Sequence, residues 1–113
     1  MDPNEVMYQV IQRCPAAPAY RAGMWILELA FTAAPERLAA RAQHRRRLAA
    51  LHADGVVRMA GPFADDEGAL IVVEAADRRT VDELIAADPY FTTPGVAVTR
   101  IRQWHPFLGA PSR

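Results

Sequence analysis

The sequence has 113 residues, of which 51% are hydrophobic and 23% are charged. This length and composition are typical of one folded domain and exclude an intrinsically disordered chain. Thirteen basic residues balance thirteen acidic ones. The zero net charge gives no electrostatic reason to expect nucleic acid or an anionic membrane as a partner.

Several mechanisms are excluded by residue types that the chain lacks. It contains no lysine, which excludes Schiff-base chemistry, lysine-bound pyridoxal phosphate and a P-loop. The only serine, Ser112, is next to the last residue, so no buried serine nucleophile is expected. The single cysteine, Cys14, suits a reducing compartment. No apolar run approaches the roughly 20 residues of a membrane span, and residues 1–12 do not resemble a signal peptide, so we expect a cytoplasmic protein.

The chain is predicted to hold one domain over residues 23–108, with an N-terminal extension over residues 1–22 and a short tail over residues 109–113. Pro15 and Pro18 interrupt any regular element within the extension. Packing on the domain, packing on a neighbouring chain and disorder are all compatible with the sequence of the extension.

The first predicted elements of the domain are a strand over residues 24–31 and a helix after it. The strand is apolar on both alternating faces, which is typical of a strand covered on both sides. The helix is rich in alanine, leucine and arginine, which are good helix formers. We expect Thr32 to cap this helix and Pro35 to occupy its first turn. Asp54 and Gly55 are expected to end it.

Two short strands and a second helix follow. The strands are predicted over residues 56–61 and 69–75, each an apolar run bounded by turn residues. Asp77 is expected to cap a helix over residues 78–88, which Pro89 ends.

A last strand is predicted over residues 96–104. Strict alternation would place one set of side chains on one face, namely Val96, Val98, Arg100, Arg102 and Trp104.

The order strand, helix, strand, strand, helix, strand predicts a ferredoxin-like α+β fold, with two helices on one face of an antiparallel sheet. Because the other apolar face would be a large exposed patch, we expect a homodimer packed sheet to sheet, as in a dimeric α/β barrel.

Helical projection of the first helix directs a histidine toward the sheet. His44 falls within the apolar arc formed by Leu38, Leu48 and Leu51. Gln43, Arg46 and Arg47 fall on the opposite side. The run of arginines from residue 45 to residue 47 is scattered around the helix, so we expect a solvated face there.

Asp88 continues the apolar stripe of the second predicted helix, which consists of Val81, Leu84 and Ile85. A carboxylate there loses hydration, and the helix dipole disfavours it by about 0.3–1 kcal/mol, so a compensating partner is expected. The inward His44 is the candidate. A carboxylate that holds an imidazole orients it and favours its protonated form, which suits general acid–base catalysis. The alternative is a core histidine beside a carboxylate that caps a loop.

Several short motifs follow in a fixed order over residues 24–108. They are His44 with Leu51, His52, Asp54 and Gly55, then Ala60, Gly61, Pro62 and Phe63, then Asp88, Pro89 and Tyr90, and finally Trp104 and Pro106. In this pattern the chain resembles the YciI-like (YCII-related) proteins of the dimeric α/β-barrel, ferredoxin-like superfamily. The resemblance implies a pair of His44 and Asp88 in a cleft of each subunit. It also implies proton transfer, elimination or isomerisation on small cyclic or aromatic compounds.

Five further residues are candidates for substrate binding, namely Arg58, Gly61, Pro62, Phe63 and Tyr90. The segment from residue 61 to residue 63 either walls a cleft or simply stops a strand. Tyr90 either donates a hydrogen bond to a ligand or packs under its loop. Arg58 either binds an anionic substrate, reaches solvent or pairs with Glu28 or Glu74.

No metal or cofactor is expected. His44 and His52 are eight residues apart, about 12 Å along a helix, so they cannot bind one ion together. No spacing typical of a zinc or iron site is present, and no glycine-rich loop opens a helix after a strand.

The leading hypothesis from the sequence is a small cofactor-independent enzyme, a lyase or isomerase. His44 would be its general acid or base, with Asp88 orienting the ring. The substrate would be a small cyclic or aromatic metabolite that undergoes isomerisation, elimination or hydrolysis. Two alternatives stay open, a non-catalytic small-molecule-binding or accessory module and a cofactor-free oxygenase.

Overall fold

The computed structural model describes residues 23–109. The predicted extension over residues 1–22 lies outside the described residues, as do residues 110–113 of the predicted tail. In chain order the elements are β1 (Met24–Phe31), α2 (Pro35–Ala53), β2 (Val57–Pro62), β3 (Gly68–Glu74), α3 (Arg78–Ala86), the short 3-10 helix η2 (Pro89–Thr92) and β4 (Val96–Trp104).

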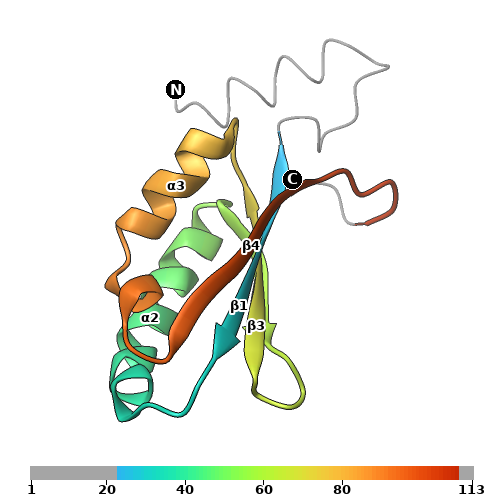
Figure 1. Cartoon of the computed structure of the whole chain (residues 1–113). Coiled ribbons are helices and arrows are strands. Elements are labelled where there is room, and N and C mark those ends of the chain that lie inside the picture. Colours follow the sequence, from blue (N-terminus) through green and yellow to red (C-terminus); the bar gives the residue numbers. More distant parts are fainter. Residues whose placement is uncertain (1–22, 110–113) are drawn as a thin grey trace.

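The four strands form one antiparallel sheet in the order β2-β3-β1-β4. Both α-helices lie against the same face of this sheet (Figure 1). Together with the element order, this arrangement is the predicted ferredoxin-like α+β fold. Within the described chain, the opposite face of the sheet is left without a helix (Figure 1).

Helix α2 begins without the side-chain cap that the sequence analysis expects. Its N-cap residue is Ala34 rather than Thr32, and it has no side-chain cap hydrogen bond. Pro35 occupies the first turn, where its missing N–H needs no acceptor. The other end is as predicted. Asp54 is the C-cap, and Gly55 follows with a φ of 83°, in the left-handed region that glycine favours.

Helix α3 is shorter at its C-terminus than predicted. Asp77 caps its start as expected, since its carboxylate accepts a hydrogen bond from the Thr80 N–H at 2.9 Å. The helix ends at Ala86, two residues before Asp88. The cause is Pro89, which disfavours the helical conformation at the residue before it. Asp88 is accordingly extended, with φ −117° and ψ 110°, and it begins η2 instead.

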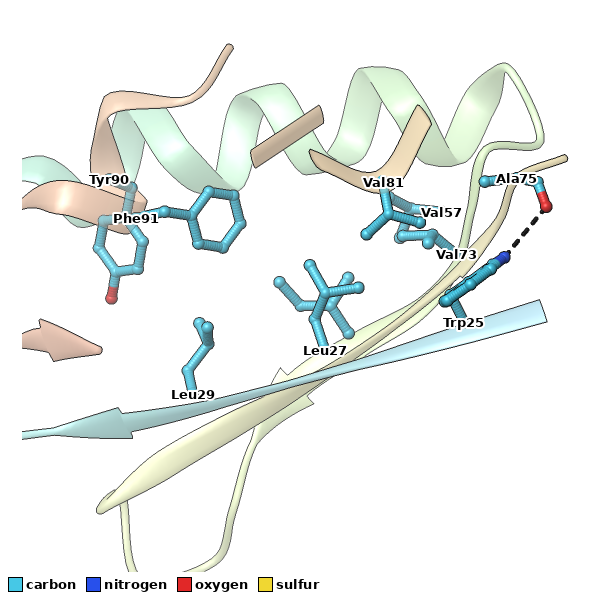
Figure 2. Close-up of a cluster of buried hydrophobic side chains, with 10 residues drawn as sticks. Trp25, Leu27, Leu29, Val57, Val73, Ala75, Val81, Tyr90 and Phe91 are labelled. Carbon is cyan, nitrogen blue, oxygen red and sulfur yellow. Dashed lines mark hydrogen bonds between the residues drawn. The ribbon is translucent and has the colours of Figure 1, made fainter. Parts of the chain in front are cut away.

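The hydrophobic core fills the layer between the sheet and the helices. Its larger buried side chains are Trp25, Leu27, Leu29, Val57, Ile71, Val73, Val81, Tyr90 and Phe91 (Figure 2). On β1, Trp25, Leu27 and Leu29 are buried and the residues between them are only half-buried, so the described chain fully covers one of the two faces of this strand. The Trp25 indole N–H donates to the carbonyl oxygen of Ala75 at 3.2 Å, which leaves no buried donor unpaired on this ring (Figure 2).

A β-bulge in β4 changes which of its side chains face the core. Glu28 of β1 pairs with Arg100, but the next residue, Leu29, pairs with Val98, so Thr99 is an extra residue. A shift of one residue reverses the side chains beyond it. Val98 therefore shares the core face with Leu29, while Arg100 shares the opposite face with Glu28. The prediction that the valines and arginines of this strand share one face is wrong, because simple alternation cannot anticipate a bulge.

Candidate functional site

The histidine and the aspartate that the sequence directs inward meet in the structure. His44 Nδ1 lies 2.6 Å from Asp88 Oδ2, and their side chains are only 7% and 6% exposed. The other carboxylate oxygen, Oδ1, accepts a hydrogen bond from the Tyr90 N–H at 3.0 Å. A buried carboxylate thus has both oxygens bonded to donors that the fold fixes in place.

Local sequence explains why Asp88 is placed there. Because α3 ends before it, Asp88 is the N-cap of η2, and Pro89 follows at the first turn, where no N–H is needed. The end of α3 is also tied to α2, since the Arg47 guanidinium donates to the carbonyl oxygen of Ala87. The helical projection predicts that Arg47 is solvated, but this hydrogen bond gives it a partner within the fold. It ties the helix that carries His44 to the residue directly before Asp88.

Aromatic contacts fix the orientation of the His44 ring. It stacks on Tyr90 with ring centroids 3.9 Å apart and planes 10° from parallel, and the edge of Phe91 approaches it with centroids 5.4 Å apart. When Asp88 is ionised it can only accept hydrogen bonds, and Nδ1 then donates the hydrogen of this bond. Nε2 then has a free lone pair in the neutral ring. It makes no hydrogen bond within residues 23–109 and is not among the fully enclosed polar atoms.

His44 and Tyr90 lie on the wall of a cavity of about 650 Å³. This volume is within the range of small-molecule sites. The cavity opens between α2 and the strands β2 and β3, with η2 at one end. Its apolar lining includes Leu29, Phe31 and Ile71. The Nε2 atom of His44 is thus available to a ligand, while Nδ1 is bonded behind it.

The five predicted substrate-binding residues divide into two groups. Gly61, Pro62 and Tyr90 line the cavity, as expected of a cleft wall. Phe63 is absent from the lining and lies against Gly68, where an added Cβ would be 3.2 Å from its ring.

Arg58 lies away from the cavity as well. A register shift between Val57 and Met59 makes it the extra residue of a second bulge. Its guanidinium donates to Glu74 Oε1 at 2.8 Å, which is one of the pairings that the sequence left open. Glu74 pairs with Met24 on the sheet face turned away from the helices. The structure therefore does not bring Arg58 to His44.

A comparison with family models identifies the YCII-related domain over residues 24–105. The chain belongs to the YCII-related family. The matched range contains the histidine, the aspartate and every residue that lines the cavity. No curated protein sequence matches the chain. Across the part that the structure describes, no helix is both long and apolar enough to cross a membrane, and no three potential metal ligands cluster together.

Two cavity residues of this YCII-related domain are missing from the sequence-based predictions. Arg37 and Arg41 line the cavity on the same wall as His44. Arg37, Arg41 and His44 occupy positions i, i+4 and i+7, a spacing that places side chains on one helix face. This spacing is the sequence signal that identifies the two arginines. Leu38, expected inward, is instead 53% exposed. The projection followed apolar residues only, whereas an arginine stem can lie against apolar surface as leucine does.

Arg45 also departs from the expected solvated face. It is exposed, yet it contributes to the cavity lining beside Arg41. Arg46 alone in the run at residues 45–47 meets the expectation of a solvated side chain. It is exposed, it does not line the cavity, and it has no ion pair or hydrogen bond among the described residues.

Proposed function

We propose that this YCII-related protein is a small-molecule enzyme, a lyase or isomerase, in which His44 transfers a proton. One observation carries the proposal. The Nε2 atom belongs to a ring whose Nδ1 is bonded to a buried carboxylate at 2.6 Å, and it is available in a cavity of about 650 Å³. This is the arrangement of a general base with an orienting partner.

In the proposed reaction, Nε2 removes a proton from an acidic C–H or O–H of the substrate. The positive charge that develops on the ring is stabilised by Asp88, which stays ionised and keeps the proton on Nδ1. Returning the proton to another atom gives an isomerisation. Loss of an anionic leaving group from the neighbouring carbon gives an elimination, with the proton left on His44. The reaction uses only the acid–base groups of the protein.

Tyr90 supports this chemistry in two ways. Its ring stacks on His44 at 3.9 Å and so keeps the imidazole plane fixed relative to a bound substrate. Its hydroxyl has no hydrogen-bond partner in the described region, although the ring is almost fully buried. We propose that this hydroxyl donates to an oxygen of the substrate. The apolar side chains of the cavity suit a small cyclic or aromatic compound.

Proton exchange with solvent tests this function without knowledge of the net reaction. Small cyclic ketones, lactones and enols are incubated with the protein in D₂O, and deuterium incorporation at carbon is followed by NMR. We expect His44→Gln to slow the exchange of any active compound by about 10²- to 10⁴-fold. His105→Gln is the matched control, because His105 is exposed beyond β4.

Other outcomes identify the alternatives. Compounds that bind in the cavity but exchange no proton would contradict catalysis and favour a binding or accessory module. Oxygen consumption in place of exchange would favour a cofactor-free oxygenase.

We also propose that the protein is a homodimer packed through the sheet face that the helices leave uncovered. Support comes from the apolar residues on this face. Met24 and Ile26 alternate with the core residues of β1, and Trp104, paired with Met24, is 42% exposed. An exposed apolar sheet face is costly in water, and a second copy would cover it. The mass in solution, measured by sedimentation at micromolar concentration, should be that of two chains. A mass of one chain would contradict the proposal.

A further inference from the structure

We propose that the cavity binds an organic carboxylate through Arg37, so that the substrate is a small cyclic or aromatic carboxylate. The proposal deepens the function above and rests on the same cavity. Its test measures binding, however, and needs no turnover.

The guanidinium of Arg37 is buried without a hydrogen-bonded counter-ion. Its side chain is only 10% exposed, and its Nε atom is enclosed and makes no hydrogen bond to the described residues. The nearest carboxylate, on Asp66, is 3.9 Å away from Nη2, which is too far for a hydrogen bond. Asp66 is itself 59% exposed, so water screens its charge. A buried guanidinium whose Nε–H has no acceptor, and whose only carboxylate neighbour among the described residues is a screened one at 3.9 Å, has lost hydration that these contacts replace only in part.

The position of this guanidinium is nevertheless well defined. Its central carbon lies 4.2 Å from the centroid of the Phe31 ring, which supports one face of the planar group. Phe31 in turn meets the edge of Tyr90 with centroids 6.4 Å apart, and Tyr90 stacks on His44. Arg37 and His44 therefore lie along one continuous aromatic wall of the cavity.

The charges around the cavity favour an anion. Three arginines line it, at positions 37, 41 and 45, whereas Asp66 is the single acidic residue among the described lining. Asp88 lies behind His44 and is bonded to its ring and to a backbone N–H. One acidic side chain against three arginines leaves the described lining of the cavity with a net positive charge.

The same geometry favours an organic carboxylate over a free inorganic anion. The planar donors of arginine match the two oxygens of a carboxylate. An inorganic ion would leave unfilled most of a cavity of about 650 Å³ whose other walls include Leu29, Phe31 and Ile71. Arg37 and His44 are seven residues apart, about 10 Å along the helix axis. A ring that carries a carboxylate at one end and an acidic hydrogen at the other can reach both.

Binding of 2-naphthoate, compared with its neutral analogue 2-naphthamide and with inorganic phosphate, tests the inference. Isothermal titration of the wild-type chain should give a dissociation constant about 10- to 100-fold lower for the carboxylate than for the amide, because the amide keeps one accepting oxygen but loses the second hydrogen bond to the guanidinium and the opposite charge. Arg37→Gln should abolish this preference. Arg46→Gln should retain it, and it is a matched control because Arg46 is exposed on the same helix and outside the cavity lining.

A second measurement on the wild-type chain covers the case in which Arg37→Gln does not fold. The Arg37 Nε–H signal in a ¹⁵N NMR spectrum should shift on addition of 2-naphthoate and not of 2-naphthamide. Equal affinity for the two compounds, no binding of 2-naphthoate at millimolar concentration, or a preference that survives Arg37→Gln would each overturn the inference. Preferential binding of phosphate would overturn it in favour of an inorganic anion.

The His44→Gln variant separates the two proposals. It should still bind 2-naphthoate if the inference is right, whatever the role of His44. If carboxylates bind through Arg37 but no compound exchanges a proton, the proposed catalysis fails and the inference stands. If neutral compounds exchange protons and 2-naphthoate does not bind, the inference fails and the proposed catalysis stands.

Discussion

Replacement of Asp88 separates the structural from the chemical role of this carboxylate. In Asp88→Ala, two buried donors lose their acceptor, namely the His44 Nδ1–H at 2.6 Å and the Tyr90 N–H at 3.0 Å. A buried donor left without a partner costs about 1–3 kcal/mol, so we expect a loss of about 2–6 kcal/mol. This is a large part of the roughly 5–15 kcal/mol by which a typical domain is stable.

Asp88→Asn should behave differently. Its amide oxygen can still accept from the Tyr90 N–H, and its NH₂ group then faces His44 Nδ1. The two groups form a hydrogen bond only if the ring moves its proton from Nδ1 to Nε2. We therefore expect a stability loss of no more than about 1 kcal/mol, because both hydrogen bonds remain. Proton transfer should nevertheless be lost, because Nε2 no longer has a free lone pair.

Urea unfolding of the two variants, combined with the deuterium-exchange assay, tests this reasoning. We expect Asp88→Ala to be strongly destabilised and Asp88→Asn to be folded but inactive. An alanine variant as stable as the wild type would refute the structural part. An asparagine variant that exchanges substrate protons at the wild-type rate would refute the chemical part.

Three further predictions concern the fold and the assembly. Leu27→Ala should lower the free energy of unfolding by about 2–5 kcal/mol in urea titrations, because Leu27 is 2% exposed within the core; a change below 1 kcal/mol would argue against the described packing. The hydrogen bond from the Thr80 N–H lowers the pKa of Asp77, so its contribution to stability is complete above about pH 4 and is lost as the pH falls further. The difference in Tm between wild type and Asp77→Ala should therefore shrink from pH 7 to pH 2, and a constant difference would contradict this cause. Ile26→Glu should convert the proposed dimer to a monomer in sedimentation experiments while the far-UV spectrum is kept, and an unchanged mass would show that the dimer forms elsewhere.

The sequence predicts the main framework because the relevant signals are local. Apolar runs bounded by glycine and proline locate the strands, and Asp77 marks the start of α3 as a side-chain cap. The approach of His44 and Asp88 is also predicted, although the helix expected to carry Asp88 ends at Ala86 and Asp88 is placed instead as the N-cap of η2. A polar residue on an apolar stripe indicates a compensating partner, and the fold supplies it at 2.6 Å.

Features that depend on the third dimension are not predictable in the same way. The extra residues at Arg58 and Thr99 arise from strand pairing, and no alternation within one strand reveals them. Arg58 thereby meets Glu74 and leaves the cavity, whereas Arg37 enters it. The helical projection does not consider Arg37, whose guanidinium lies against the Phe31 ring on the wall of the cavity. Arg37 and His44, seven residues apart on α2, therefore share the helix face that lines the cavity although both are polar.

The protonation site of His44 tests the proposed catalytic base most directly, and it requires no substrate. Long-range ¹H–¹⁵N NMR of the imidazole, recorded above the pH at which the ring loses its charge, distinguishes the two neutral forms. We expect hydrogen on Nδ1 and a bare Nε2 in the wild type, with the reverse in Asp88→Asn. A wild-type ring that carries its hydrogen on Nε2 would contradict the account, because the atom facing the cavity would then have no lone pair with which to accept a proton.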